Sequence, residues 1–250
     1  MMSRVVLTVF AAAFLSSLAP SVAAQDRVTI DFENGAAFSG YNDVRIPGNT
    51  GTLFSLTDDL RSDTTYFYRV RASVRLAPKH VVSALASPLR VNASGAFNRA
   101  IFFQGATFEP GTPVAALYVF NSYGLTYRYE FVQTANWRFG IGATGKVRDA
   151  VMRLESAGQR AEKTNLGFVP LVNVLLEPRL AERLTLRLDG DALAAPQGRA
   201  EDVFAGVLVK VNRHVSVKAG YRVLEGGADN DEVYTFALFH YAAVGVLIRF

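Results

Sequence analysis

The 250-residue sequence contains no cysteine, so neither disulfides nor thiolate metal ligands contribute to its structure. It also lacks long apolar runs: beyond the N-terminus no stretch reaches about 18 consecutive apolar residues, which excludes a transmembrane helix there. A strong charge bias is missing as well, since the formal net charge is only +4 and no basic run is interleaved with aromatics. We therefore predict no nucleic-acid partner, no metal site and no cofactor.

Residues 1–24 have the pattern of a secretory signal peptide. A single basic residue, Arg4, precedes an apolar run, and Val22 and Ala24 occupy the small-residue positions before a cut ahead of Gln25. A buried N-terminal helix is the competing interpretation, but the segment has no capping residues. The pattern predicts an exported protein.

Apolar and polar residues alternate along most of the remaining chain. In 65–76, 123–131 and 184–191 one face of the expected strand is apolar and the other carries charge. Tight turns follow some of these segments, whereas the connections 92–112, 154–163, 194–201 and 225–232 look longer. Short turns on one side and long loops on the other predict an antiparallel up-and-down β-barrel that spans a membrane.

Counting back from the C-terminus gives ten strands, near 233–250, 215–224, 202–211, 184–193, 165–176, 136–150, 114–132, 79–91, 64–77 and 51–57. Eight or twelve strands stay open, because 51–57 is poorly patterned and 100–108 fits either a strand or a loop. We interpret residues 25–50, rich in Gly, Asn and Pro, as a periplasmic lead-in or a plug, and residues 51–250 as the barrel.

A soluble β-sandwich also alternates, with its apolar face turned inward. The clustering of Tyr129, Phe131, Trp137 and Phe139 around one turn favours a bilayer interface instead. If apolar residues face lipid, nearly all strand glycines point inward and leave room for long basic side chains. The predicted lumen has formal charge +8, from Arg69, Arg71, Arg75, Arg128, Arg138, Lys146, Arg148, Arg187, Lys210, Lys218, Arg222 and Arg249 against Glu130, Glu177, Asp189 and Asp191.

The chain ends on a strand with apolar residues at every second position: Val244, Val246, Ile248 and Phe250. This ending resembles the C-terminal assembly signal of Gram-negative outer-membrane β-barrel proteins. The resemblance implies an outer-membrane location, insertion by the barrel assembly machinery, and contact with outer-membrane lipids and lipopolysaccharide. It brings no catalytic residues with it.

Three motifs suggest chemistry and were weighed against simpler explanations. The segment 140–147, GIGATGKV, resembles phosphate-binding loops, but strand alternation continues through it and we expect no nucleotide. Asp189 and Asp191 enter the lumen together and can share a proton, yet neighbouring arginines favour a structural ion-pair network. His240 near the outer rim is a candidate base, with Ser216 and Glu225 as weak partners.

Two classes of function follow. In the first, the chain is a non-enzymatic barrel whose arginine-rich lumen is either a closed salt-bridge network or a narrow pore favouring anions. In the second, it is a rim hydrolase acting on lipid A or peptides with His240 as base. The first class is favoured because His240 lacks a convincing nucleophile nearby.

Overall fold

The computed structural model describes residues 27–196 and 198–250, and all regular structure in them is β. The predicted signal peptide lies outside the described residues. No helix in the described part of the chain is long and apolar enough to cross a membrane. The strands are β1 Val28–Arg45, β2 Phe54–Ser55, β3 Arg61–Ser62, β4 Thr65–Ala77, β5 His80–Ser87, β6 Arg90–Ala96, β7 Ile101–Phe103, β8 Ala106–Phe108, β9 Pro113–Gln133, β10 Trp137–Ser156, β11 Gln159–Pro178, β12 Leu184–Ala195, β13 Gly198–Lys210, β14 Val215–Asp229 and β15 Tyr234–Arg249.

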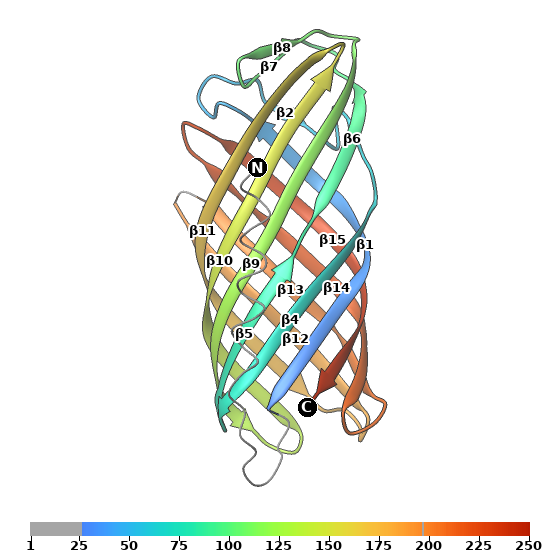
Figure 1. The fold of residues 1–250 in the computed structure, drawn as a ribbon, viewed down its shortest axis with the longest axis vertical. Helices are drawn as coiled ribbons and strands as arrows, with labels where there is room; N and C mark the ends of the chain where they lie inside the picture. The colour runs from blue at the N-terminus through green and yellow to red at the C-terminus, as the bar shows by residue number, and fades with distance from the viewer. Residues whose placement is uncertain (1–26, 197) are drawn as a thin grey trace.

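The longer strands form a closed antiparallel barrel whose wall has ten strand positions (Figure 1). The circle runs through β1, β4, β5, β9 and β10 to β15, and β15 closes it by pairing with β1 from Thr29↔Arg249 to Arg45↔Tyr234. The strands β5 and β6 share one place in the wall, because both pair with β9 and are separated at Pro88. The prediction of an all-β, up-and-down barrel of ten strands is confirmed.

The first wall strand is not where the sequence suggested. Residues 28–45, expected as part of a lead-in or plug, form β1 and pair with both β15 and β4. Residues 51–57, expected as the first strand, contain only the two-residue β2. The alternation in 28–33, VTIDFE, marks a strand, but the glycines and asparagines that follow and a bulge between Ser39 and Tyr41 obscure it.

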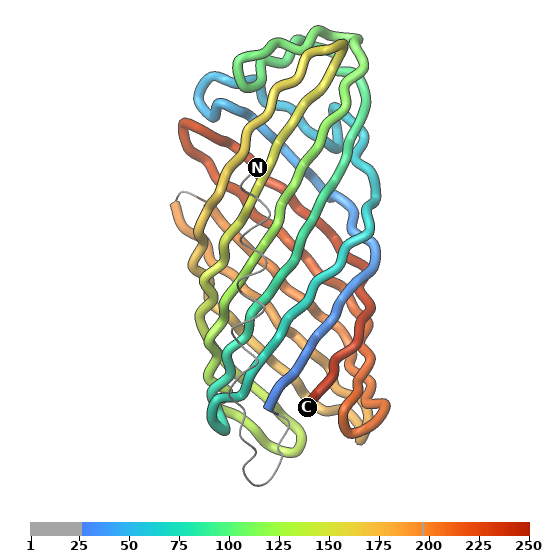
Figure 2. The backbone as a smooth tube through the Cα atoms, in the orientation of Figure 1, coloured from blue at the N-terminus to red at the C-terminus, as the bar shows by residue number. Residues whose placement is uncertain are grey.

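The two ends of the barrel differ. At one end, here called the short-turn end, the strands join through residues 78–79, 134–136, 179–183 and 211–214, as expected. At the other, the tall end, the predicted loops 154–163, 194–201 and 225–232 are mostly strand, because the hairpins continue past the apolar band. The β10–β11 hairpin rises well above the β12–β13 hairpin (Figure 2). Residues 100–108 form the separate β7–β8 hairpin on top and add no wall strand.

The interior has two zones. The zone toward the short-turn end is lined by charged side chains, and the zone toward the tall end is filled by an apolar core. Loop residues complete this core: Phe54 packs edge-on against Phe97 and Phe103, with ring centroids 5.4 and 5.9 Å apart. A side chain that enters from β10, such as Leu154, is fully buried there. The barrel is therefore filled along its height rather than hollow.

The outer face carries the apolar residues. Val244 and Phe250 are exposed on the outside of β15, and Val246 and Ile248 share this face half-buried. On β9, exposed Tyr123 and Phe131 lie eight residues apart, roughly 20 Å along the axis for a tilted strand. Aromatics at both edges of an apolar belt of this height are typical of a membrane barrel.

Candidate functional site

The strongest concentration of chemistry is a network of ion pairs inside the barrel. It runs without a break from the short-turn end to mid-height, and each acid except the last, Asp191, lies between two or more cations. Its members in order are Arg75, Glu130, Arg138, Glu177, Arg187, Asp31, Lys218, Glu33, Arg222, Asp202, Lys146 and Asp191. We call this set the lumen network.

Asp202 of β13 is a node at which three cations meet. Its carboxylate accepts from Arg69 at 2.9 Å, from Lys146 at 3.0 Å and from Arg222 at 2.7 Å. All four side chains are buried, and they come from four different strands. Charge-assisted hydrogen bonds of this length are among the stronger ones in proteins, so the node fixes four strands of the wall relative to one another.

Glu33 of β1 is the second node. Arg222 donates to it from Nε at 2.6 Å and from Nη2 at 2.9 Å, and Lys218 donates at 2.8 Å. The ring of Phe204 lies beneath both cations, 5.1 Å from the Lys218 ammonium and 5.4 Å from the Arg222 guanidinium carbon. A Cβ on either Gly206 or Gly220 would fall within 2.7 Å of this ring. The two glycines therefore make room for the aromatic floor of the node.

Glu130 and Glu177 anchor the network at the short-turn end. Glu130 accepts from Arg75 at 2.9 Å and from Arg138 at 2.6 Å. Arg138 also donates to Glu177 at 2.7 Å, and Arg187 reaches Glu177 at 2.6 Å. Arg187 then continues to Asp31 at 3.0 Å. These bonds link strands that are far apart in the sequence, from β1 to β12.

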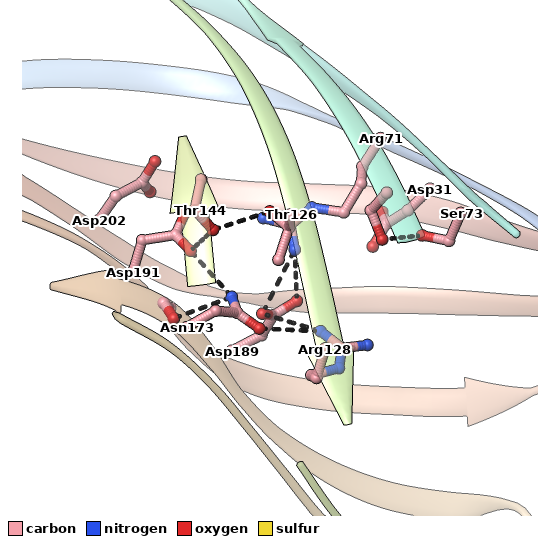
Figure 3. A network of polar contacts seen from close by, with 12 residues as sticks. Asp31, Arg71, Ser73, Thr126, Arg128, Thr144, Asn173, Asp189, Asp191 and Asp202 are labelled. Atoms are coloured by element: carbon pink, nitrogen blue, oxygen red, sulfur yellow. Dashed lines mark hydrogen bonds and ion pairs between the residues drawn. The ribbon is translucent and has the colours of Figure 1, made fainter. Parts of the chain in front are cut away.

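The two aspartates singled out as a potential acid pair lie side by side on β12 (Figure 3). Arg71 donates to Asp189 at 3.5 Å, and Arg128 lies 3.9 Å from it. Asp191 instead accepts from the Thr144 hydroxyl at 2.7 Å and from the Asn173 amide at 2.8 Å. The hydroxyls of Thr126 and Thr144 are themselves bonded at 2.8 Å. Both carboxylates are thus held by fixed donors, an arrangement typical of structure rather than of proton transfer.

The charge of this lumen is smaller than the sequence suggested. Among the described residues, Lys210 is exposed and Arg249 lies at the short-turn mouth, while three acids had been missed. Ten basic side chains face seven acidic ones, a net formal charge of +3 rather than +8: Arg69, Arg71, Arg75, Arg128, Arg138, Lys146, Arg148, Arg187, Lys218 and Arg222 against Asp31, Glu33, Glu130, Glu177, Asp189, Asp191 and Asp202. The cavity left at the network's centre is about 10 Å³, close to the volume of one water-sized sphere.

The missed acids had sequence signals. Asp31 and Glu33 lie on the polar face of the alternation in VTIDFE, which was obscured by the loop-like segment that follows. Asp202 shares the parity of Gly206 and Lys210 and is the first residue of the strand predicted over 202–211. Applying the parity rule to the end of the predicted strand finds Asp202, whereas Asp31 and Glu33 require that 28–45 be recognised as a strand.

Arg148 of β10 is the exception within the lumen. It is buried, and its guanidinium lies 4.6 Å from the Phe120 ring centroid. No carboxylate in the described part of the chain forms an ion pair with it, and its Nε and Nη2 atoms have no hydrogen-bond partner there. It is the buried basic residue of the predicted site that forms no ion pair within the described residues.

His240 lies on the outer face of β15 within an aromatic group. Its Nδ1 and the Tyr221 hydroxyl are hydrogen-bonded, and its ring is 5.3 Å from that of Phe38. Ser216 is buried near the short-turn end beside Arg249, and Glu225 accepts from Arg199 at 2.8 Å. The structure therefore brings neither candidate partner to His240, which has the surroundings of an interfacial aromatic residue.

The glycine-rich segment 140–147 is strand throughout. It pairs with β11 without interruption from Gly140↔Leu175 to Val147↔Phe168. A phosphate-binding loop needs free backbone amides at the start of a helix. These amides belong instead to a ladder in the wall, as the alternation predicted.

No protein-family model matches the sequence, and no curated protein matches it. Solved structures do. The outer membrane protease OmpT from Escherichia coli superposes with TM-score 0.55 at 11% identity, over 90% of this chain and 97% of that one. The transport unit of the autotransporter AIDA-I from Escherichia coli gives TM-score 0.46 at 8% identity, with 93% of each chain covered. Neisserial surface protein A gives 0.37 at 15% identity, over 89% of this chain and 97% of that one. The likeness to OmpT shows that the chain has the fold of an outer-membrane β-barrel.

Proposed function

We propose that this chain is a non-enzymatic, non-conducting barrel of the bacterial outer membrane. The barrel spans the membrane and presents its tall end at the cell surface. The apolar outer belt, its aromatic edges and the shared fold support the membrane location. The signal peptide predicted over residues 1–24 would export it, and the strand that carries Val244, Val246, Ile248 and Phe250 would engage the barrel assembly machinery. Its lipid partners would include lipopolysaccharide in the outer leaflet.

The filled lumen is the observation that carries this proposal. A pore needs a continuous water path, but the space at the centre of the lumen network is only about 10 Å³. Above it the apolar core is closed by side chains from the loops, including the fully buried Leu56 and Phe97. A permeating ion would have to cross both zones.

Electrostatics also disfavours the anion pore considered from the sequence. Rings of uncompensated positive charge select anions. Here Asp31, Glu33 and Asp202 neutralise cations that looked free, and each arginine of the Asp202 node is bonded to a carboxylate. The arginines therefore stabilise the barrel wall through ion pairs and are not free to bind a permeating ion.

Conductance of purified protein in planar bilayers tests the proposal. We expect no discrete current steps in potassium chloride. Insertion is checked in parallel by flotation of proteoliposomes and by a heat-dependent mobility shift of the folded barrel on denaturing gels. Steady current steps from protein shown to be inserted would overturn the non-conducting role, and a preference for chloride would restore the anion pore.

A further inference from the structure

The barrel wall is not closed over its full height between β11 and β12. Their pairing ends at Val172↔Ala192, although β11 continues to Gln159 and β12 to Ala195. Pro170, which has no N–H to donate, lies just above the last pair. The short β12–β13 hairpin then leaves the upper half of β11 without a neighbour on that side (Figure 2). We call this gap, between residues 159–171 and 193–195, the lateral opening.

Side-chain exposure shows that the gap reaches the interior. Along the inner face of β11, Leu171 is 4% exposed, Val169 is half-buried and Asn165 is exposed. On β12 the inner-facing residues change in the same direction, from Asp191 at 1% to Leu193 at 40% exposed. Side chains of interior parity become accessible because the facing wall is absent.

The lower part of the rim, residues 166–171 and 193–195, is apolar and lies at the edge of the membrane belt. Leu166 and Phe168 on β11 are 75% and 70% exposed. Phe168 is in register with Val147, which is in register with the edge aromatic Tyr123. Unpaired strand edges are not left exposed to hydrocarbon, because each free N–H or C=O costs several kcal/mol there. The free backbone groups of this edge are therefore expected at the membrane–water interface, where water can pair with them.

Arg148 of β10 starts opposite the β11 edge of this opening, and its buried guanidinium extends into the lumen. It is in register with Gly167, the one residue of the β11 edge without a side chain to cover it. From the far side, a Cβ on Gly226 would come within 3.4 Å of its Nη1. Its Nε and Nη2, which have no partner in the described ranges 27–196 and 198–250, lie on one edge of the guanidinium. That edge is the one that grips a carboxylate through two parallel hydrogen bonds.

We propose that the lateral opening is a binding site for a long-chain carboxylic acid from the outer leaflet, with its carboxylate on Arg148 and its chain against Phe168, Leu166 and Leu193. A buried charge without a counterion is costly, so a site of this kind gains its missing partner when the acid binds. The single guanidinium matches a monoanion, and the nearest cation on the same edge, Lys163, is already paired with Glu232 at 3.2 Å. The apolar rim fits a hydrocarbon chain rather than a sugar headgroup.

Binding of oleate labelled at its carboxyl carbon tests this proposal on the full barrel in lipid nanodiscs, with oleyl alcohol as the uncharged comparison. We expect wild type to bind oleate more tightly than the alcohol. Arg148→Met keeps an unbranched side chain over Phe120 and should weaken oleate binding about tenfold or more, while leaving the alcohol unchanged. The control Arg160→Met removes an exposed arginine at the β10–β11 tip and should bind as wild type does.

The route is tested with the double variant Leu171→Cys, Leu193→Cys, whose disulfide would close the wall one step above the last pair. The chain has no other cysteine, so the reduced form serves as the control. Because residues 159–170 stay unpaired, we expect oxidation to slow oleate exchange rather than abolish it, and reduction to restore the original rate. Equal binding of acid and alcohol, wild-type affinity in folded Arg148→Met, or complete displacement of oleate by chloride would each overturn the proposal. These outcomes are independent of conductance and leave the non-conducting role untouched.

Discussion

Asp202 shows what a single acid does inside this barrel. Three cations converge on its carboxylate, and all are buried. A buried ion pair contributes little net stability compared with apolar packing, because both charges must be desolvated. Removing only one partner is different, since the remaining charges stay buried without compensation.

We therefore expect Asp202→Asn to lower the free energy of unfolding by about 3–5 kcal/mol. Asp58→Asn, at an exposed loop acid, should change it by less than about 0.5 kcal/mol. Urea unfolding in lipid vesicles, followed by the mobility shift of folded barrel, measures both. Equal stability of the two variants would show that the node does not hold the walls together.

At the tall end, Asp59 and Arg99 link two loops outside the membrane belt. Arg99 donates to the Asp59 carboxylate at 2.6 and 3.0 Å, and Asp59 also accepts from the Ser55 amide at 2.9 Å. The hydrogen bonds from Arg99 hold the pKa of Asp59 below its ordinary value, against partial desolvation that raises it. Because the folded pKa is the lower one, the stabilisation is present above about pH 4 and is lost as the pH falls through the folded pKa.

Arg99→Met should accordingly raise the Asp59 pKa toward that of a free aspartate. Carboxyl-carbon NMR of labelled aspartate, titrated in wild type and variant, measures the shift directly. The same titration follows Asp58, an exposed neighbour that serves as the internal control. An Asp59 pKa that does not move would remove Arg99 as the cause.

At the scale of elements, the sequence predicted strands wherever apolar and charged residues alternate without interruption. The strand containing Tyr66 to Leu76 and the final strand to Phe250 were predicted from this pattern, and the barrel class followed. The strand β1 was missed because Gly35 and Gly40 read as loop residues, yet Gly35 is a wall position: a Cβ there would meet the Ala242 carbonyl at 2.1 Å. Close backbone approach demands glycine where a pattern sees only a break.

Partners within the site were harder to predict than its members. Alternation along the strand places Arg222 in the lumen, but the sequence does not show that its partner is Glu33, which lies near the other end of the chain. That pairing depends on the β15–β1 register, which closes the barrel. The error in lumen charge has this origin: leaving β1 out of the wall removed two of the acids that neutralise it.

Engineered disulfides test the place of β1. Asn34 is paired with Val244 in the wall, so Asn34→Cys with Val244→Cys should oxidise readily. Asn34→Cys with Val217→Cys should not, because Val217 is the partner of Val246 one strand further away, about 10 Å across two strand spacings. Gel mobility without reductant reads out both pairs. Efficient bridging in the second pair, or none in the first, would contradict the register.

On the scale of the whole molecule, the barrel is strongly asymmetric. The short-turn end is level, whereas the other rim slopes from the tall β10–β11 hairpin down to β12–β13 (Figures 1 and 2). The long hairpins and the β7–β8 cap lie on the same end. Membrane barrels place short turns in the periplasm and longer segments outside, so we expect the tall end of this chain to face the exterior.

An epitope tag inserted at Gly158 should therefore be accessible to antibody on intact cells. This glycine is in a tight, exposed turn, and a Cβ there would meet nothing within 4 Å. A tag in the opposite turn, at Arg213, should be stained only after the outer membrane is permeabilised. Staining of Arg213-tagged intact cells would mean that the orientation is inverted.

The ion pairs of β1 also constrain how the molecule is built. Asp31 and Glu33 lie on the first strand, whereas their hydrogen-bond donors Arg187, Lys218 and Arg222 follow 156 to 189 residues later. Among the nearer strands, Arg69 of β4 lies 3.8 Å from Glu33. A partly assembled barrel therefore lacks some of the counterions of these carboxylates, and uncompensated charges are costly in the hydrocarbon of a membrane. Full compensation of these two carboxylates therefore requires β12 and β14 as well as β4, so the interior charges are balanced only in the closed barrel.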